Sequence, residues 1–219
     1  MSWERARSEE QKKIREEEIL AAARGLLDKK PFHTITLSEL AREVSFTRAN
    51  LYKYFESREE VYLALLAREI GEFGERLFEE WKTLEGSTGG GVECFLKLWV
   101  PALAQEHRMM TLMSMAGTIL EKNCSNRVLL KSKASMASAS QTYFLPILKS
   151  FFPEMPVEAL AATMSFLIIT ANGLFPFCGL SQEQKELLRG NGLEGIVHEF
   201  EKDYPPMIRA YLHSLETAP

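Results

Sequence analysis

The stretch "ITLSELAREVSFTRANLYKYF", residues 35–55, most narrowly limits what this chain can fold into. Thr36 is followed three residues later by Glu39, a spacing typical of a capping box at the start of a short helix. Thr47 can cap a second helix from Arg48 to Tyr54. Only "SFT" separates the two helices, and so short a connection predicts a helix-turn-helix unit. The first helix would bury an apolar stripe of Leu37, Leu40, Ala41 and Val44.

The second helix of this unit has two different faces. Leu51 and Phe55 lie four residues apart and should face inward, with Phe46 closing the corner. The side chains left on the outside are Arg48, Asn50, Tyr52, Lys53 and Tyr54. Arg can pair with guanine and Asn with adenine in the major groove, while Lys and Tyr bind the phosphate backbone. A solvated amphipathic helix is the alternative, but the capped helices on both sides favour a helix that recognises DNA.

The rest of the chain also has helical patterns, so the sequence predicts an all-α fold. Ser57 and Glu60 form a second capping box, which opens a long helix to about Leu84. "EGSTGGG", residues 85–91, is the clearest break. Further helices are predicted near 92–106, 109–121, 126–151, 157–174, 182–189 and 193–215. We expect a helix-turn-helix DNA-binding domain over 1–58 and an effector-binding and dimerisation domain over 59–219.

Charge and cysteine content limit the partners of the chain. Residues 1–58 hold twelve Lys and Arg against ten Asp and Glu, whereas residues 59–219 hold fourteen against twenty. A mildly basic head on an acidic body fits contact with nucleic acid at one end only. Three cysteines without a CxxC motif indicate a reducing cytoplasm and no metal site. We expect no cofactor.

A membrane location is not expected. The N-terminus "MSWERARSEEQKK" is too charged for a signal peptide. The longest uncharged run, residues 159–182, contains several polar residues, and its strongly apolar part is short. This run therefore reads as a buried helix of a cytoplasmic protein.

The segment "ITLSELAREVSFTRANLYKYFESREEVYLALL" resembles the N-terminal signature of the TetR family of transcriptional repressors. The match covers about residues 10–68, and its most specific part is the "LYKYF" motif with the "SREE" that follows. Beyond this segment the chain is similar to the family only in length and helicity. The resemblance implies a three-helix DNA-binding head, a connecting fourth helix and a C-terminal body that binds an effector and dimerises.

The resemblance also implies roles for individual residues in the head. The resemblance places Thr36 and Ser38 near phosphates, at the start of the second helix. It places Arg48, Ala49 and Asn50 at the start of the third helix, facing base edges. It places Tyr52, Lys53 and Tyr54 in contact with the DNA backbone or bases, and Arg58 in contact with a phosphate.

Two residues in the turn depart from the family pattern. Ser45 stands where the family usually has a turn glycine, and a residue with a Cβ is strained at positive φ. Phe46 replaces a smaller aliphatic residue. The flanking spacing is intact, so these changes affect the pitch of the recognition helix and not the fold.

The body is rich in Met and Phe and poor in charge between Val92 and Leu180. Thioethers and aromatic rings can line an apolar pocket for a small hydrophobic effector. Ordinary helical core is the alternative for any one of these residues. The candidate ligand-binding residues are Phe95, Trp99, His107, Met113, Tyr143, Phe166 and Asn172.

The stretch Ala159–Thr170 is apolar around most of its circumference, so a helix there must be buried on several sides. A recognition helix of about seven residues reads too few base pairs to find one site in a genome. These points predict a two-fold symmetric homodimer formed by the helices near 157–175 and 193–215. The predicted interface residues are Leu160, Met164, Leu167, Ile168, Phe200, Ile208 and Leu212.

The sequence therefore predicts a ligand-responsive DNA-binding regulator, most simply a repressor of a near-palindromic double-stranded DNA operator. A small apolar effector would release it from that operator. The alternative is an effector-independent DNA-binding or DNA-organising protein with a partner-binding body. An enzyme is not expected, because the chain has no paired carboxylates at metal spacing and no GxSxG motif. "STGGGV" lacks the lysine of a phosphate-binding loop.

Overall fold

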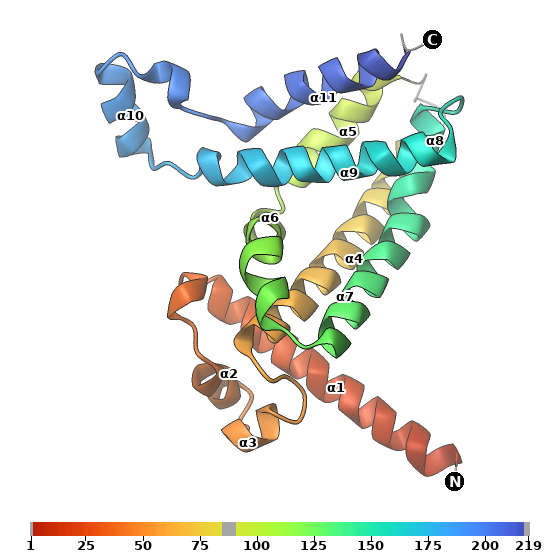
Figure 1. Ribbon diagram of the computed structural model, residues 1–219, viewed down its shortest axis with the longest axis vertical. Helices are drawn as coiled ribbons and strands as arrows, with labels where there is room; N and C mark the ends of the chain where they lie inside the picture. The colour runs from red at the N-terminus through yellow and green to blue at the C-terminus, as the bar shows by residue number, and fades with distance from the viewer. Residues whose placement is uncertain (1, 85–90, 217–219) are drawn as a thin grey trace. The chain divides into compact units, whose positions relative to one another are not determined.

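The computed structural model describes residues 2–84 and 91–216, with side chains from Glu10 to Leu215 (Figure 1). Within these ranges every regular element is helical, which confirms the predicted all-α class. Nearly all of the expected break at "EGSTGGG" lies outside the described residues, which resume at Gly91.

The chain folds into two compact units. The first consists of the residues up to Glu69 together with Met115–Ser135, and the second of Ile70–Ser114 together with the residues from Met136 onward. The division falls inside helix α4 (Arg58–Leu84), whereas the boundary predicted at residue 58 is the first residue of that helix. Residues 115–135, which the sequence assigned to the body, thus pack with the N-terminal unit.

The first unit begins with helix α1 (Ser2–Leu27), followed by the short turn η1 (Phe32–Thr34). Helices α2 (Leu37–Glu43) and α3 (Arg48–Leu51) form the helix-turn-helix, and α4 starts at Arg58. The unit is completed by two helical turns, η2 (Ala116–Leu120) and η3 (Glu121–Asn123), and by the start of α7 (Asn126–Ala139). Its core consists of buried side chains from α1, α2, α3 and α4, among them Ile19, Leu40, Leu51, Phe55 and Leu65.

Tyr62 on α4 joins α4 to α1 in the core of this unit. Its ring packs edge-on against Phe32, with 5.2 Å between the ring centroids, and its hydroxyl donates a hydrogen bond to the Ala23 carbonyl at 3.1 Å. Burial raises the pKa of the Tyr62 hydroxyl above its ordinary value, because the charged form loses its hydration.

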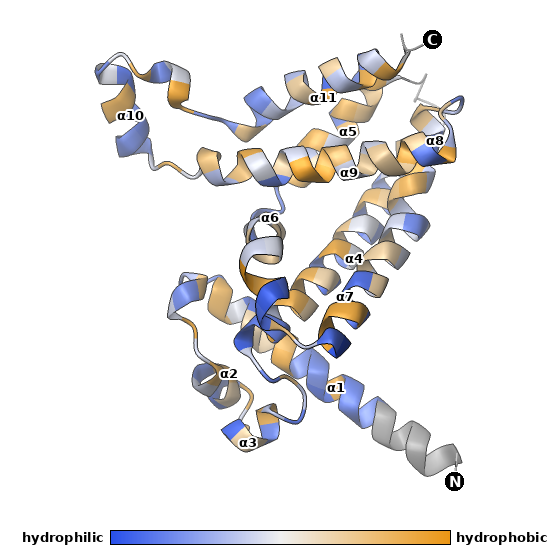
Figure 2. Ribbon diagram, viewed as in Figure 1, coloured by the Kyte–Doolittle hydropathy of each residue, from blue (hydrophilic) through white to orange (hydrophobic). Residues whose placement is uncertain are grey.

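The second unit contains α5 (Val92–Ala104), α6 (His107–Met115), η4 (Ser140–Phe144) and α8 (Leu145–Phe151). It continues with α9 (Val157–Leu174), η5 (Phe175–Cys178), α10 (Gln182–Gly190), η6 (Glu194–Ile196) and α11 (Phe200–Glu216). The helix predicted over 193–215 thus begins only at Phe200. Helix α11 packs along α5 and α9, and the hydropathy colouring shows how apolar α5 and α9 are (Figure 2).

Aromatic side chains dominate the core of the second unit. Trp99 lies at its centre, with ring centroids 5.7 Å from Phe95 and 6.0 Å from Phe144. The Trp99 indole N–H donates to the Tyr204 hydroxyl at 3.1 Å, and that hydroxyl donates to the Leu167 carbonyl at 2.9 Å. This buried chain of hydrogen bonds joins α5, α11 and α9 without leaving these polar groups unpaired.

The stretch Val157–Cys178 is long and apolar enough to cross a bilayer by length and composition alone. A core helix of a globular protein passes the same test. In the structure Leu160, Leu167 and Leu174 are buried against the rest of the second unit, and 33% of the apolar window is buried in all.

Candidate nucleic-acid interface

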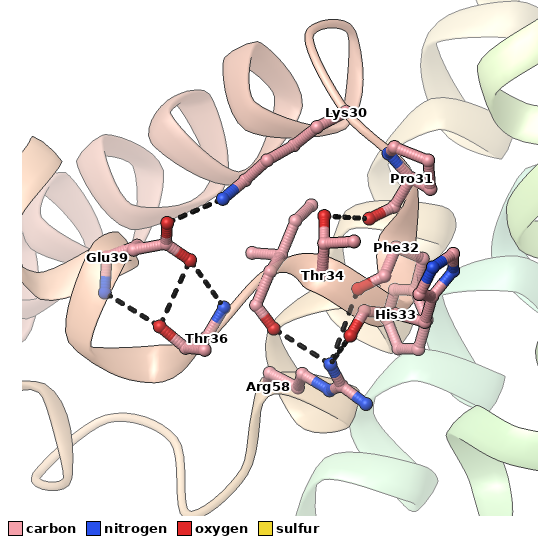
Figure 3. A network of polar contacts seen from close by, with 9 residues as sticks. Lys30, Pro31, Phe32, His33, Thr34, Thr36, Glu39 and Arg58 are labelled. Atoms are coloured by element: carbon pink, nitrogen blue, oxygen red, sulfur yellow. Dashed lines mark hydrogen bonds and ion pairs between the residues drawn. The ribbon is translucent and has the colours of Figure 1, made fainter.

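The start of α2 is held by the predicted capping box. The Thr36 hydroxyl accepts from the Glu39 N–H at 3.2 Å, and the Glu39 carboxylate accepts from the Thr36 N–H at 3.0 Å (Figure 3). The second carboxylate oxygen of Glu39 binds the Lys30 ammonium at 2.6 Å. The hydrogen bond from Lys30, followed by those from Thr36, lowers the pKa of Glu39 to about 2. These contacts fix the N-terminus of α2 to the chain that follows α1.

The turn between α2 and α3 contains the strain that the sequence suggested. Ser45 has φ of 55°, in the left-handed region that glycine adopts most readily. The N–H of Phe46 donates to the Ala41 carbonyl at 2.8 Å, which closes the end of α2. The serine therefore occupies the turn conformation, at a cost that a glycine would avoid.

Helix α3 presents the predicted outward face. The Thr47 hydroxyl accepts from the Asn50 N–H at 3.2 Å and caps the helix. Leu51 and Phe55 are buried, whereas the exposed side chains are Arg48, Ala49, Asn50, Tyr52 and Lys53. The regular helix covers only Arg48–Leu51, and the predicted extension to Tyr54 continues as hydrogen-bonded turns.

Tyr54 is less available than its neighbours. Its side chain is half-buried and lies against Phe46, with 6.2 Å between the ring centroids. Its carbonyl accepts a hydrogen bond from Arg127 at 3.1 Å. Tyr54 thus anchors the end of the recognition segment, by which we mean residues 47–55, and also borders its surface.

Arg58 is half-buried, and its guanidinium already has partners within its own chain. One guanidinium nitrogen donates to the carbonyls of Ile35 and His33 at 2.8 and 3.1 Å (Figure 3). The guanidinium carbon also lies 4.6 Å from the centroid of the Phe32 ring, and Nε pairs with Glu59 at 2.9 Å. Nη1 of Arg58 therefore holds the loop before α2 while Nε is paired with Glu59, and the phosphate contact of Arg58 stays a prediction.

Thr36 and Ser38 are exposed at the N-terminal end of α2, where the resemblance placed phosphate contacts. The Thr36 hydroxyl is engaged in the capping box, but the backbone N–H groups of a first helical turn also bind anions. Beside α3, a surface groove is lined by Lys12 of α1 and by Lys53. These lysines provide positive charge next to the exposed face of α3.

The candidate ligand-binding residues do not converge on one site. Trp99 and Met113 line an apolar cavity of about 30 Å³ in the second unit. The other side chains around it were not among the candidate ligand-binding residues, and include Phe73, Leu103, Met109, Phe144, Met164 and Ile168. Of these, Met164 and Ile168 were predicted for the dimer interface. Their helical periodicity indicates burial, but it cannot tell a cavity wall from solid core.

The other five candidates lie elsewhere in the second unit. Phe166 stacks on Tyr211 with ring centroids 3.8 Å apart, and Tyr143 packs against Phe78 at 5.8 Å. Phe95 stacks against Trp99 in the aromatic core. His107 borders a separate open groove beside Phe175. Asn172 is half-buried, and its side-chain oxygen has no hydrogen-bond partner in the described part of the chain.

The residues predicted for a dimer interface lie inside the single chain. Leu167 and Ile208 have no exposed surface. At most 9% of the surface is exposed in four others, Leu160, Met164, Phe200 and Leu212. Ile168 is half-buried and lines the apolar cavity. Because their own chain covers these side chains, all of them except Ile168 leave little or no surface for a second subunit in this structure. The surface still open on these helices includes Val157, Ala161, Ser165 and Ile169 of α9 and Met207 and Ala210 of α11.

Comparisons with known families agree with this architecture. The family model described as "Bacterial regulatory proteins, tetR family" matches residues 19–65. The model described as "Tetracyclin repressor-like, C-terminal domain" matches residues 67–219. The two matches together take in the helix-turn-helix and the whole body that follows it.

Solved structures share the fold at low sequence identity. A TetR-family transcriptional regulator from Streptomyces coelicolor aligns with a TM-score of 0.53 and 18% identity, over 91% of this chain and 98% of that chain. Another structure, from Streptomyces coelicolor A3(2), aligns at 17% identity over 91% and 93% of the two chains, with a TM-score of 0.45. No curated protein matches the chain.

Proposed function

Because the chain belongs to the TetR family of DNA-binding transcription regulators, which are not enzymes, we propose that it is a ligand-responsive repressor acting as a homodimer in the cytoplasm. The observation that carries the proposal is the capped helix α3, which exposes Arg48, Ala49 and Asn50 in its first turn. The N-terminal residues of a recognition helix are those that reach base edges in the major groove.

We assign base reading to Arg48 and Asn50. Arg48 has the donors for guanine, and the Asn50 amide can both donate to and accept from adenine. Lys53 adds a phosphate contact that carries no sequence information. The capping box at Thr36 and the hydrogen bonds from Arg58 to the loop before α2 support this assignment, because they fix α2 and that loop with respect to α4.

The proposed effector is small and apolar. The cavity beside Trp99 is lined by apolar side chains throughout, which suits a hydrophobic ligand. At about 30 Å³ it holds no drug-sized molecule, so the methionines around it must move to admit one. An effector that prefers this opened body to the DNA-bound conformation would lower operator affinity by linkage.

The small cavity also favours a second candidate, a DNA-binding regulator that responds to no effector. The two candidates differ in a titration of hydrophobic compounds against the protein bound to its DNA. For a responsive repressor, the compound should raise the melting temperature of the protein and should release the duplex over the same range of compound concentration. A compound panel that changes neither quantity would favour the effector-independent candidate.

The proposed homodimer uses the open faces of α9 and α11. Val157, Ala161, Ser165 and Ile169 share one side of α9, and Ile169 is 69% exposed. Met207 and Ala210 face outward on α11. Packing these faces across a two-fold axis would remove them from water and would match two heads to a near-palindromic operator.

The dimer is tested by sedimentation equilibrium of Ile169→Glu combined with Met207→Glu. The wild type should be a dimer at micromolar concentration and the double variant a monomer. Leu130→Glu, which places a charge on a 72% exposed leucine of α7, should stay dimeric. A monomeric wild type contradicts the dimer, and a dimeric double variant contradicts the assigned faces.

DNA recognition is tested by selecting duplexes from a random pool with the wild-type protein. An inverted repeat should emerge, and Asn50→Ala should lose discrimination at one position of each half-site. The expected loss is roughly 1–3 kcal/mol for each bidentate contact. Selection of no common sequence, or unchanged discrimination by Asn50→Ala, would contradict α3 as the reading helix.

A further inference from the structure

A buried carboxylate joins the end of the recognition segment to a distant part of the chain. Glu60, in the first turn of α4, has no exposed surface. One of its oxygens accepts from the Glu56 N–H at 2.6 Å, and the other accepts from the Ser125 N–H at 2.8 Å. Ser125 lies 65 residues further along the chain but within the same compact unit.

Two more hydrogen bonds link the same two segments, which we name the 54–60 turn and the 123–127 corner. The Ser57 hydroxyl donates to the Asn123 carbonyl at 2.8 Å. The Arg127 guanidinium donates to the Tyr54 carbonyl at 3.1 Å. Each of the three links ends on a backbone atom, so together they fix the path of the main chain and not only side-chain positions.

This geometry differs from the capping box that the sequence predicts. The Ser57 hydroxyl does accept from the Glu60 N–H at 3.1 Å. The Glu60 carboxylate, however, binds the N–H of Glu56 and not that of Ser57, and its second oxygen is left for Ser125. Burial by itself raises the pKa of Glu60, but the hydrogen bonds from Ser125 and Glu56 outweigh this and lower the pKa, so the carboxylate is charged.

Apolar packing does not hold this junction by itself. Helices α1, α4 and α7 and the end of the recognition segment border a partly open cavity of about 150 Å³, lined by Leu20, Phe55 and Val128 and also by charged side chains such as Glu17 and Arg68. Helix α3 consists of a single turn, so its direction depends on what holds the residues after it. The 54–60 turn is the segment that directly follows, and the three polar links hold it in place.

We propose that Glu60 is a positioning residue for DNA recognition, which ties the end of the recognition segment to the 123–127 corner and makes this corner part of the DNA-reading unit. The inference rests on the proposed role of α3 as the reading helix. A shift of the 123–127 corner moves the Ser125 N–H, and with it the carboxylate that holds the Glu56 backbone. Base contacts from Arg48 and Asn50 then lose their register, while phosphate contacts by lysine side chains are retained.

Two substitutions cut the link from opposite ends. Glu60→Gln keeps the shape of the side chain but replaces one acceptor oxygen by an amide that cannot accept. Ser125→Pro removes the donor N–H and places the ring Cδ where the hydrogen pointed, so the Glu60 oxygen at 2.8 Å must move away while its charge is kept. Cys124 has φ of −128° and ψ of 156°, the extended backbone that a following proline requires.

Each substitution has a matched control. Glu56→Gln makes the same charge change on an exposed side chain of the same turn and keeps the Glu56 N–H. Asn126→Pro places a proline one residue later, at the first position of α7, where a helix tolerates it. All variants are compared on the duplex selected by the wild type and on a shuffled duplex of equal length, and their melting temperatures are measured.

Glu60→Gln and Ser125→Pro should each weaken binding to the selected duplex about tenfold, as expected for a lost hydrogen bond to a charged group. Affinity for the shuffled duplex should stay level or rise, because Glu60→Gln removes a negative charge. The double variant should lose no more than either single variant, since both cut one link. A merely structural role would lower the melting temperature and leave the ratio of the two affinities unchanged.

The proposal would be overturned if both single variants kept the wild-type ratio of affinities for the selected and shuffled duplexes. It would also be overturned if the losses of affinity for the selected duplex added up in the double variant. Should Glu60→Gln fail to fold, the affinity ratio of Ser125→Pro decides. Asn50→Ala separates this inference from the proposed function. If Asn50→Ala loses discrimination while the two link variants keep it, the positioning role is wrong and the reading helix stands. If Asn50→Ala also keeps it, the reading helix is wrong.

Discussion

The Arg48 guanidinium donates two hydrogen bonds to the Tyr52 hydroxyl, at 2.8 and 3.2 Å, and lies 5.4 Å from the centroid of the Tyr52 ring. The two residues are one helical turn apart on the exposed face of α3 and of the turn that follows it. This contact restricts the rotamers of the proposed guanine-reading arginine before any DNA is bound. A side chain that is ordered in advance loses less entropy on binding.

Tyr52→Phe should therefore weaken binding to the selected duplex by about 1 kcal/mol, which is the usual net value of one hydrogen bond. Arg48→Ala should cost more, because it also removes the base contact. Fluorescence anisotropy titrations of the single and double variants measure the coupling. If Tyr52→Phe still weakens binding when Arg48 is already alanine, Tyr52 touches DNA directly and does not act through Arg48.

Lys53, expected to contact backbone or bases, and Arg58, expected to contact a phosphate, should behave differently on substitution. Lys53→Ala should weaken all duplexes alike and reduce the slope of log affinity against log salt by about 1. Arg58→Ala should instead destabilise the fold by roughly 1–3 kcal/mol, because the carbonyls of His33 and Ile35 lose their donor. Salt titrations and urea denaturation of both variants separate the two roles. A lower salt slope for Arg58→Ala at unchanged stability would support its phosphate contact.

Ser45→Gly should stabilise the protein by about 1 kcal/mol, since it relieves the positive φ of 55° in the turn of the helix-turn-helix. Ser38→Gly, the same substitution on an exposed position inside α2, should destabilise it by about 0.5–1 kcal/mol. Urea denaturation midpoints measure both changes. The strain interpretation fails if the two substitutions shift stability in the same direction.

Gly74→Ala should destabilise the second unit, although alanine ordinarily favours a helix. A Cβ at position 74 would lie 2.8 Å from the Tyr143 ring and 3.1 Å from that of Phe144, so η4 would have to move, at a cost of roughly 1–3 kcal/mol. Gly71→Ala, one turn earlier in α4 with open space around it, should stabilise by about 1 kcal/mol. If the close approach is real, the melting temperature of Gly74→Ala lies below that of the wild type and the melting temperature of Gly71→Ala lies above it. Stabilisation by both substitutions would rule the close approach out.

Acid should remove the contribution of the Glu39 carboxylate to stability. The pKa of Glu39 is lowered from 4.5 to about 2 in the folded protein, so unfolding takes up a proton between these values. Stability from this group is complete above pH 4.5 and is lost as the pH falls toward 2. Glu39→Gln should be less stable than the wild type at pH 7, with a smaller difference at pH 3. A difference that does not change with pH would show that charge is not its cause.

The local structure of the head follows from the sequence by itself. The capping box at Thr36, the cap at Thr47 and the buried pair Leu51 and Phe55 all depend on residues within a few positions of one another. Such short-range patterns settle where a helix starts and which of its faces is apolar. The strain at Ser45 was suggested by the resemblance, because Ser45 stands where the family usually has a turn glycine.

The contacts between distant segments were decided only by the tertiary structure. Helix α9 is apolar nearly all round, so periodicity could not show that Leu160 and Leu167 face their own chain while Ile169 remains open. Nothing near Glu60 in the sequence points to Ser125, and nothing near Arg58 shows that backbone carbonyls occupy its donors. The residue type of a side chain determines which groups it can hydrogen-bond. The packing of helices that are far apart in the chain determines which of these groups lies within reach.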